Sequence, residues 1–313
     1  MKFPSPSSAE AVVDIRGLSR RFGSKAALDE VSLFVPRGSI FGLVGENGAG
    51  KTTLIKHILG LLRAETGTVR VFGHDPVAEP VAVLGAIGYL SEQPDLPGWM
   101  RLEELLRYTQ AFYPNWDSTY AEQLRQQFGL DLSQRLRTLS KGQRAKAGLL
   151  AARAHRPDLL LLDEPSSGLD PIVRRDILEA VIRTVAEEGR TVIFSSHLLE
   201  EIERVSDHIA MLHRGRIVMC GPLDEIKAQH RRVTLRFEAT QANPPAVAGA
   251  LSVSGLGKEW TVICNGGRVQ LPAVAAELGA RIVEEHGASL NEIFIAHAAE
   301  PSPDSASGPT PIS

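Results

Sequence analysis

The chain has 313 residues, of which 43% are hydrophobic and 23% are charged, so its composition suits an ordinary globular protein with one large domain and room for a small one. Its formal net charge of −3 lacks the basic excess typical of non-specific nucleic-acid binders, and we expect no nucleic-acid partner. The two cysteines, Cys220 and Cys264, are too few and too far apart for a disulfide framework or a zinc site, which favours buried thiols in a reducing compartment.

The two ends of the chain have low-complexity compositions. The first ten residues are rich in Ser and Pro and lack the apolar region of a secretory signal. We expect residues 1–10 and the Pro/Ser-rich residues 301–313 to be disordered. No stretch reaches the ~18 consecutive apolar residues of a membrane span, so any membrane role would depend on a separate membrane protein.

Between these ends, short apolar runs alternate with helix-like stretches, a pattern typical of an α/β fold with helices on both faces of a sheet. Helices are expected over Thr52–Leu62, after Pro171 and after Leu198. Four of five predicted strands are nearly continuous in apolar residues, as in strands buried on both faces. The predicted strands are Ser39–Val44, Ile87–Leu90, Leu159–Asp163, Thr191–Ser195 and His208–Leu212.

Two segments depart from this alternation. Residues 100–155 show helical periodicity and no convincing strand, which predicts a helical insertion. Near residue 230 the composition shifts, and Val233, Leu235 and Phe237 alternate with polar residues as in a half-buried strand. We therefore expect a small C-terminal α/β domain over residues 229–300. Its other predicted elements are strand Trp260–Cys264, helix Leu271–Leu278, strand Arg281–Glu285 and helix Leu290–His297.

A phosphate-binding motif follows the first predicted strand. Residues 45–52 match G-x-x-x-x-G-K-[ST], between a strand and a helix as the motif requires. Glycines let backbone N–H groups approach phosphate, Lys51 adds a full positive charge, and the Thr52 hydroxyl can ligate Mg²⁺. The alternative is a Gly-rich turn that merely ends a strand. The predicted ATP-binding residues here are Gly45, Glu46, Asn47, Gly48, Ala49, Gly50, Lys51, Thr52 and Thr53.

Two carboxylates end the predicted strand Leu159–Asp163. Ligands bind at the C-terminal edge of such sheets, so Asp163 is a candidate Mg²⁺ ligand and Glu164 a candidate catalytic residue that polarises the attacking water. Because Pro165 and Ser166 follow, a capped helix start is the structural alternative. The chain contains no N-K-x-D motif of the kind that reads the base in GTPases.

The segment Leu139–Gln143 opens a helix upstream of these carboxylates. Here the chain resembles the ATP-binding subunits of ABC transporters, whose signature reads L-S-G-G-Q, with Lys141 in place of the third residue. The resemblance implies that Ser140, Gly142 and Gln143 contact the γ-phosphate of an ATP held by the opposite subunit of a dimer. A Ser-capped helix without this role is the alternative.

Further residues extend the resemblance over residues 11–228 in the family order. Ser167–Asp170 matches the D-loop, which implies that Asp170 acts across the dimer, and His197 matches the switch histidine, a catalytic residue at the γ-phosphate. The resemblance implies a P-loop NTPase domain of the ABC type with an antiparallel β subdomain and a helical insertion, followed by the small C-terminal α/β appendage.

Two positions match the family less closely. Phe22 lies where an aromatic ring stacks on adenine, with an ordinary core phenylalanine as the alternative. The family's Q-loop glutamine, which ligates Mg²⁺, follows a strand like Ile87–Leu90, and here the chain reads Ser-Glu-Gln-Pro. Spacing favours Glu92 and side-chain chemistry favours Gln93, so both stay candidates.

The resemblance also implies the partners and the location. We expect ATP and Mg²⁺ as cofactors, an integral membrane transporter subunit, and a dimer with a second copy or a related ATP-binding subunit, at the cytoplasmic face of the cell membrane. Segments Phe112–Asp117 and Leu290–Phe294 are similar to the bacterial exporter-type branch, which favours export. A soluble ABC ATPase acting on ribosomes or nucleic acid, or a sensor complex, is the alternative.

Aromatic residues gather where the membrane subunit docks in this family. All four tyrosines and two of the three tryptophans lie between residues 89 and 120. Because aromatic residues are enriched at protein interfaces, we hypothesise that Trp99, Met100, Tyr113 and Trp116 border the docking groove. The alternative is that they form the small core of the helical insertion.

Overall fold

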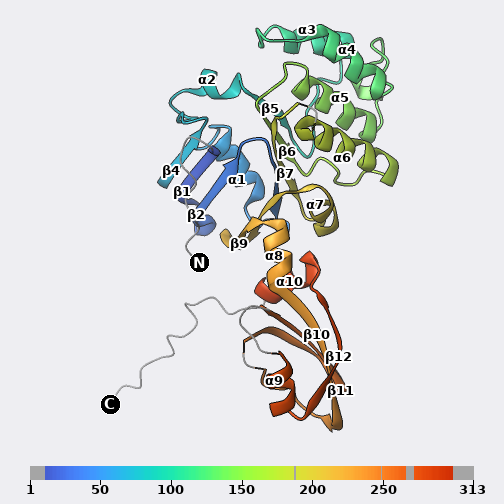
Figure 1. Cartoon of the computed structure of the whole chain (residues 1–313). Coiled ribbons are helices and arrows are strands. Elements are labelled where there is room, and N and C mark those ends of the chain that lie inside the picture. The colour runs from blue at the N-terminus through green and yellow to red at the C-terminus, as the bar shows by residue number, and fades with distance from the viewer. Residues whose placement is uncertain (1–10, 187, 248, 266–270, 299–313) are drawn as a thin grey trace. The chain divides into compact units, whose positions relative to one another are not determined.

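The computed structural model describes residues 11–186, 188–247, 249–265 and 271–298 (Figure 1). The segments expected to be disordered, 1–10 and 301–313, lie outside these residues. The chain divides into two compact units, Met1–Cys220 and Gly221–Ser313, earlier than the boundary after residue 228 that the composition indicates. Each unit has its own sheets and its own apolar core.

The first unit is built on a six-stranded sheet with the order β5-β6-β7-β3-β8-β9. The pairs β5/β6, β6/β7, β7/β3 and β3/β8 are parallel. All residues of β3, β6 and β7 are buried, which explains why these strands are mainly apolar, with polar residues only at the ends of β6 and β7. The strands are β3 (Ile40–Val44), β5 (Ile87–Leu90), β6 (Leu159–Asp163), β7 (Thr191–Ser196), β8 (His208–His213) and β9 (Arg216–Pro222).

The C-terminal ends of four neighbouring strands meet at one edge of this sheet. Register aligns Leu90 of β5 with Leu162 of β6, Asp163 with Ser195 of β7, and Ser196 with Val44 of β3. The segments that follow these strands carry the P-loop, the Q-loop candidates, Glu164 and His197, whereas the signature segment lies elsewhere, at the start of a helix. The topology therefore places the motif candidates of four distant segments along one edge.

An antiparallel sheet with the order β2-β1-β4 forms a second layer of the first unit. Its strands are β1 (Ala11–Phe22), β2 (Lys25–Pro36) and β4 (Thr66–Val71). One apolar cluster joins residues of this sheet, such as Ile15 and Val35, to Leu54 of helix α1 (Lys51–Ile58) and to Leu43 and Leu161 of the parallel sheet. The antiparallel subdomain of the expected fold is thus present and shares a core with the parallel sheet.

Helices occupy the remainder of the first unit. The insertion over residues 100–155 is helical, as the periodicity predicts, and its helices group together in green in Figure 1. It contains α3 (Leu102–Gln110), α4 (Ser118–Gln127), a 3₁₀ turn (Leu136–Thr138) and α5 (Lys141–Arg153). The other helices are α1 (Lys51–Ile58), α2 (Pro80–Leu84), α6 (Pro171–Ala186) and α7 (Leu199–Val205).

Helix α1 is shorter than the predicted Thr52–Leu62. It ends at Ile58 because Gly60 adopts a φ of 71° and closes a Schellman-type cap. In this cap the Gly60 N–H donates to the His57 carbonyl at 3.1 Å, and the Leu61 N–H donates to the Lys56 carbonyl at 2.9 Å. Apolar periodicity continues through Leu62, so periodicity alone overestimated the helix.

The second unit contains a three-stranded antiparallel sheet with the order β11-β10-β12. Val233, Leu235 and Phe237 of β10 are buried, as their alternation predicts, and pack with Trp260 and Val262 of β11. Cys264 is a buried free thiol and Cys220 a half-buried one. The elements are α8 (Leu223–Gln229), β10 (His230–Gln241), β11 (Ala250–Asn265), α9 (Leu271–Glu277), β12 (Ala280–Gly287) and α10 (Leu290–Ala298).

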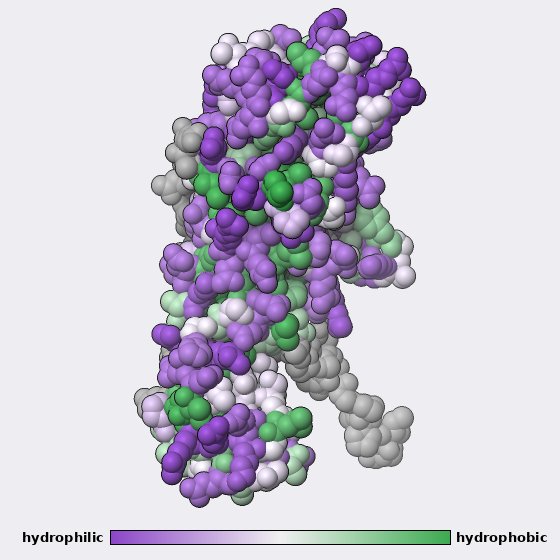
Figure 2. Space-filling view, turned by 90° about the vertical axis from the view of Figure 1, so that its right-hand side faces the viewer, coloured by the Kyte–Doolittle hydropathy of each residue, from purple (hydrophilic) through white to green (hydrophobic). Residues whose placement is uncertain are grey.

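The surface is mainly hydrophilic in the view of Figure 2, and hydrophobic residues form small separate patches there. In the described part of the chain, no helix combines the length and the apolar content needed to cross a membrane.

Candidate active site

The phosphate-binding motif forms the turn between β3 and α1, which begins at Lys51. Its glycines are required by close backbone packing. A Cβ at Gly45 would clash with the Leu212 carbonyl oxygen, and a Cβ at Gly50, whose φ is 116°, would lie 2.6 Å from the Ala27 carbonyl oxygen. Gly45 and Gly50 thus let the loop fit tightly against its neighbours, where a side chain would not fit.

The other residues of the motif divide into an exposed tip and a packed base. Glu46, Asn47 and Gly48 are exposed, whereas Ala49 is buried. Thr52, at the start of α1, is exposed, and Thr53 is half-buried with its carbonyl bonded to His57 Nδ1 at 2.8 Å. The tip is therefore the part that is free to contact a phosphate.

Lys51 is a buried cation, with only 6% of its side chain exposed. Its Nζ donates to the carbonyl oxygens of Gly45 at 2.6 Å and Glu46 at 3.2 Å. It also forms an ion pair with Glu164 Oε1 at 3.0 Å. Because two charges in a buried site need each other for compensation, Lys51 and Glu164 are a coupled pair.

Glu164 follows β6 directly and has a φ of 50°, an uncommon conformation for a residue with a side chain. Its N–H donates to Ser195 Oγ at 2.9 Å, which holds this backbone against β7. Its Oε2 accepts hydrogen bonds from His197 Nδ1 at 2.7 Å and from the His197 N–H at 3.3 Å. The structure thus joins the two predicted catalytic residues directly.

Asp163 is buried at the end of β6, and its Oδ1 accepts a hydrogen bond from Ser195 Oγ at 2.7 Å. On the adjacent strand β5, burial and the negative charge of Asp163 together raise the pKa of Tyr89 to about 12. Ser195 is therefore a bridge that fixes both neighbouring carboxylate residues, Asp163 by its side chain and Glu164 by its backbone.

A cavity of about 230 Å³ lies against the motif. It brings together the P-loop, the segment after β5 and the segment after β6. The residues that line it are Asn47, Gly48, Lys51, Thr52, Glu92 and Glu164. Both Q-loop candidates line a neighbouring cavity, but of the two only Glu92 also lines this one. The geometry favours Glu92, in agreement with the spacing argument.

We expect Glu92→Ala to lower ATP turnover by about 10- to 100-fold, because it removes a carboxylate from the cavity that contains Lys51 and Glu164. Gln93→Ala is the matched control, and we expect it to stay within about twofold of wild type because its side chain points into the other cavity. Steady-state phosphate release measures both variants. A larger loss in Gln93→Ala than in Glu92→Ala would reverse the assignment.

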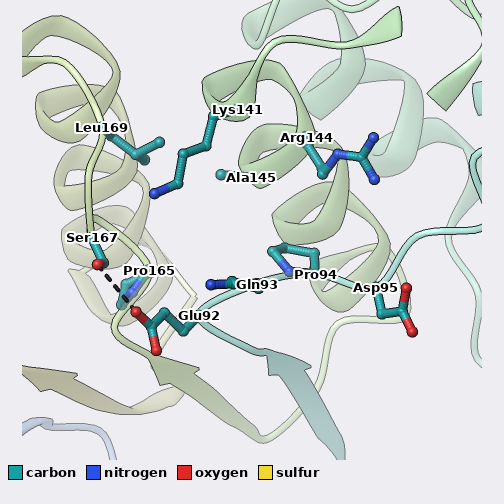
Figure 3. Close-up of a pocket in the computed structure, with 10 residues that line it drawn as sticks. All are labelled: Glu92, Gln93, Pro94, Asp95, Lys141, Arg144, Ala145, Pro165, Ser167 and Leu169. Carbon is teal, nitrogen blue, oxygen red and sulfur yellow. Dashed lines mark hydrogen bonds between the residues drawn. The ribbon is translucent and has the colours of Figure 1, made fainter. Parts of the chain in front are cut away.

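The neighbouring cavity, of about 550 Å³, lies between the Q-loop segment, the start of α5 and the D-loop segment (Figure 3). Across it, Ser167 Oγ donates to Glu92 Oε1 at 3.3 Å. Lys141 extends its side chain toward the D-loop in Figure 3, and its Nζ lies so close to Gly168 that a Cβ there would clash. The unusual third residue of the signature thus packs against the D-loop of the same chain.

The oxygen atoms around the first cavity suit Mg²⁺. The Thr52 hydroxyl and the carboxylates of Glu92 and Glu164 face it. No group of three or more His, Cys, Asp or Glu residues forms a self-sufficient metal site in the described residues. Mg²⁺ commonly takes one or two protein oxygens plus phosphate oxygens and waters, so the donor set fits this ion in the presence of ATP.

The signature segment is a helix start. Ser140 is the N-cap of α5, with its Oγ accepting from the Gln143 N–H at 3.2 Å, while Gln143 Oε1 accepts from the Ser140 N–H at 2.9 Å. This capping box is the structural alternative considered for the segment. None of the described residues that line the P-loop cavity comes from 139–143. Within one chain, the signature therefore lines the neighbouring cavity through Lys141 and contributes nothing to the described lining of the P-loop cavity.

Asp170 and Phe22 also lie outside the P-loop cavity. Asp170 Oδ1 accepts from the N–H groups of Ile172 and Val173 at 3.0 Å each, so it caps the start of α6. Phe22 is 49% exposed, and the Arg20 guanidinium lies 5.0 Å from the centre of its ring. It is therefore not a core residue, and its ring is accessible to a ligand.

An apolar groove of about 430 Å³ lies between the Q-loop segment and the helical insertion. Leu61, Leu84, Tyr89 and Tyr113 are among its lining residues, and Leu61 is 63% exposed. Tyr113 stacks on His155 with ring centroids 3.7 Å apart. Burial lowers the pKa of His155 to about 4, so this imidazole under the groove is neutral at physiological pH.

Of the four residues hypothesised to border a docking groove, only Tyr113 is among the described residues that line this one. Trp99 is 70% exposed elsewhere, Met100 is buried and Trp116 is half-buried. The other three hypothesised residues therefore lie outside the lining of this groove.

Comparison with known proteins identifies the family. A family model described as ABC transporter matches residues 28–167. The ABC transporter ATP-binding protein YtrB of Bacillus subtilis (strain 168) is 29% identical over 285 residues, covering 91% of this chain and 97% of YtrB. The daunorubicin/doxorubicin resistance ATP-binding protein DrrA of Streptomyces peucetius is 32% identical over 311 residues, covering 93% of this chain and 94% of DrrA. The chain belongs to the ABC transporter family.

A solved structure described as the ATP binding subunit of an ABC transporter has the same fold. It is 32% identical, with a TM-score of 0.64, and the match covers 70% of this chain and 92% of that one. The expected fold class, a P-loop ABC domain of mixed α/β structure, is thereby confirmed. The chain is an ATP-binding subunit of an ABC transporter, and it is an ATP hydrolase.

Sequence reasoning overlooked some residues that organise this ABC site. Ser195 was assigned only to the end of a predicted strand, yet it bonds to both Asp163 and Glu164. Ser167 was counted in the D-loop match without its contact to Glu92. A signal was present for Ser195, because polar residues at the end of an otherwise apolar buried strand need hydrogen-bond partners.

Proposed function

We propose that this chain dimerises on ATP and drives transport, in the direction of export, through a separate integral membrane subunit. The observation that carries the dimer is the separation of the signature from the P-loop cavity, whose lining includes the P-loop, Glu92 and Glu164. A second copy, or a related ATP-binding subunit, supplies Ser140 and Gly142 to complete each site. The N-terminus of α5 is suited to this contact, because it presents backbone N–H groups to an anion.

Within one chain, different residues bind the phosphates, activate the attacking water and hold Mg²⁺. Lys51 binds the β- and γ-phosphates, exchanging its ion pair with Glu164 for a phosphate. Glu164, held by His197, polarises the water that attacks the γ-phosphorus, and cleavage of the bond to the β-phosphate oxygen yields ADP and phosphate. Thr52 and Glu92, which line the cavity, would hold Mg²⁺, with Asp163, buried beside Glu164 at the end of β6, as a further ligand. When bound, the ion would neutralise phosphate charge.

Binding and hydrolysis set the state of the dimer. ATP contacts two subunits in the closed dimer and one in the open form, so its differential affinity favours closure. Hydrolysis removes the bridging γ-phosphate and lets the dimer reopen. The cycle thus supplies the alternation that a membrane subunit needs for transport.

The apolar groove beside the Q-loop is the proposed dock for the membrane subunit. Exposed apolar side chains such as Leu61 line it, and it adjoins the segment that contributes Glu92 to the ATP cavity. Docking there would link the membrane subunit to the nucleotide site and place the chain peripherally at the cytoplasmic face of the membrane. Export is supported by the similarity to DrrA, which is named for drug resistance.

A pull-down from gently solubilised membranes of the native host tests this function. The tagged wild-type chain should recover an integral membrane protein in near-stoichiometric amount, and Leu61→Glu should lose it because a charge enters the groove. Val81→Glu is the control, since Val81 is 87% exposed and lies outside the groove lining. Recovery of ribosomes or nucleic acid alone would contradict the transporter assignment.

The direction of transport is measured with the recovered membrane subunit. Inverted vesicles that contain both proteins should accumulate the transported compound when ATP is added outside. ATP-driven loss of the compound from these vesicles would indicate import instead.

A further inference from the structure

A buried carboxylate outside the ATP cavity connects the two segments that carry the catalytic residues. Glu201, on α7, is only 6% exposed. Its Oε2 accepts hydrogen bonds from Ser166 Oγ at 2.6 Å and from Ser196 Oγ at 3.0 Å. Since buried charge is costly unless it is paired and hydrogen bonded, this arrangement calls for a specific reason.

The two serines lie next to the proposed catalytic residues. Ser166 follows Glu164 by two residues, and Ser196 directly precedes His197. Ser196 Oγ also accepts from the Leu198 N–H at 3.0 Å, which fixes the turn on the other side of His197. One oxygen atom of Glu201 therefore joins the segment after β6 to the last residue of β7.

Arg174 supplies the counter-charge from a third element, α6. Its Nε lies 3.1 Å from Glu201 Oε1, and its Nη2 lies 3.5 Å from the Leu169 carbonyl oxygen in the D-loop segment. Glu201 thus contacts Ser166, directly before the D-loop segment, and its partner Arg174 contacts Leu169 within that segment. Oε2 therefore accepts the hydrogen bonds from both serines, and Oε1 faces Arg174 as an ion pair.

We propose that Glu201 is a positioning residue that sets the geometry of the Glu164–His197 contact. The contact is short, 2.7 Å between Glu164 Oε2 and His197 Nδ1, and it joins two different loops. The Ser166–Glu201–Ser196 bridge runs between the same two loops and prevents them from separating. This inference rests on the proposed catalytic roles of Glu164 and His197, because Glu201 acts only through them.

Glu201→Gln tests the proposal, because it keeps the side-chain volume but replaces one acceptor oxygen by an NH₂ donor. If the amide oxygen accepts from both serines, the amide NH₂ group faces the Arg174 Nε–H. Two hydrogen-bond donors then point at each other. We expect kcat for ATP to fall by about 10- to 100-fold through misplacement of the reacting groups, with ATP affinity within about twofold of wild type. Glu200→Gln is the control on the same helix, since Glu200 is exposed, and it should retain wild-type turnover.

A double-mutant cycle separates positioning from a general structural effect. In a His197→Ala background, Glu201→Gln should change the single-turnover rate by less than about twofold, because the contact that it positions is already gone. An equal fold-loss in both backgrounds, or full activity of Glu201→Gln, would overturn the proposal. If Glu164→Gln itself keeps wild-type turnover, the proposed catalytic role fails first. If Glu164→Gln is inactive but Glu201→Gln is fully active, the positioning role alone is refuted and the catalytic role of Glu164 stands.

Discussion

Glu164→Gln should bind ATP, lose about 10²- to 10⁴-fold in turnover, and accumulate as a dimer. The amide keeps the shape of the side chain but removes the negative charge that polarises water and accepts from His197 Nδ1 at 2.7 Å. It also removes the counter-charge of the buried Lys51 Nζ, 3.0 Å away. ATP then becomes the best available partner for this cation, so we expect ATP affinity to be equal to or higher than that of wild type.

Three measurements on the same samples check this expectation. Phosphate release reports turnover, fluorescent-nucleotide titration reports affinity, and size-exclusion chromatography with and without ATP reports the dimer. Glu103→Gln is the control, because Glu103 is an exposed carboxylate in the first turn of α3, away from the ATP cavity. Wild-type turnover of Glu164→Gln would exclude its catalytic role. A purely monomeric protein at saturating ATP would contradict the dimer.

Much of the fold could be predicted because buried strands appear in this sequence as short, continuous apolar runs. The runs at Leu159–Asp163 and Ile87–Leu90 are strands with the predicted bounds, since strands buried on both faces must be apolar throughout. The end of α1 was missed for the opposite reason. Leu61 and Leu62 continue the apolar pattern, whereas the backbone of Gly60 ends the helix.

The candidate site was predictable where one short segment carries its own chemistry, as in the P-loop. It was not predictable where a residue's role depends on the direction of its side chain or on a contact with a residue far away in the sequence. Glu92 and Gln93 are neighbours in sequence and both line the larger cavity, and only the fold shows that Glu92 alone also lines the P-loop cavity. Glu201 meets Ser166 from 35 residues away, a pairing set by the packing of α7 against the sheet.

Lys51→Met should abolish ATP binding and also destabilise the first unit. Methionine fills similar volume without charge, so the phosphates lose their cation and we expect at least about 100-fold weaker ATP binding, equivalent to about 2.7 kcal/mol. Glu164, 8% exposed, is then left as a buried carboxylate without its counter-charge. Breaking a buried ion pair by removing one partner costs about 3–5 kcal/mol of unfolding free energy.

The double variant Lys51→Met/Glu164→Gln separates the two consequences. It leaves neither charge in the site, so most of the lost unfolding free energy should return while ATP binding stays absent. Urea-dependent amide hydrogen exchange in β3 and β6 measures the stability of this unit alone. Equal stability of the single and double variants would mean that Glu164 does not depend on Lys51 for compensation. Recovery in the double variant would instead show that the buried Lys51–Glu164 ion pair stabilises the chain without nucleotide. The same pair then keeps the Lys51 ammonium in the site, where a phosphate can replace the Glu164 carboxylate as its partner.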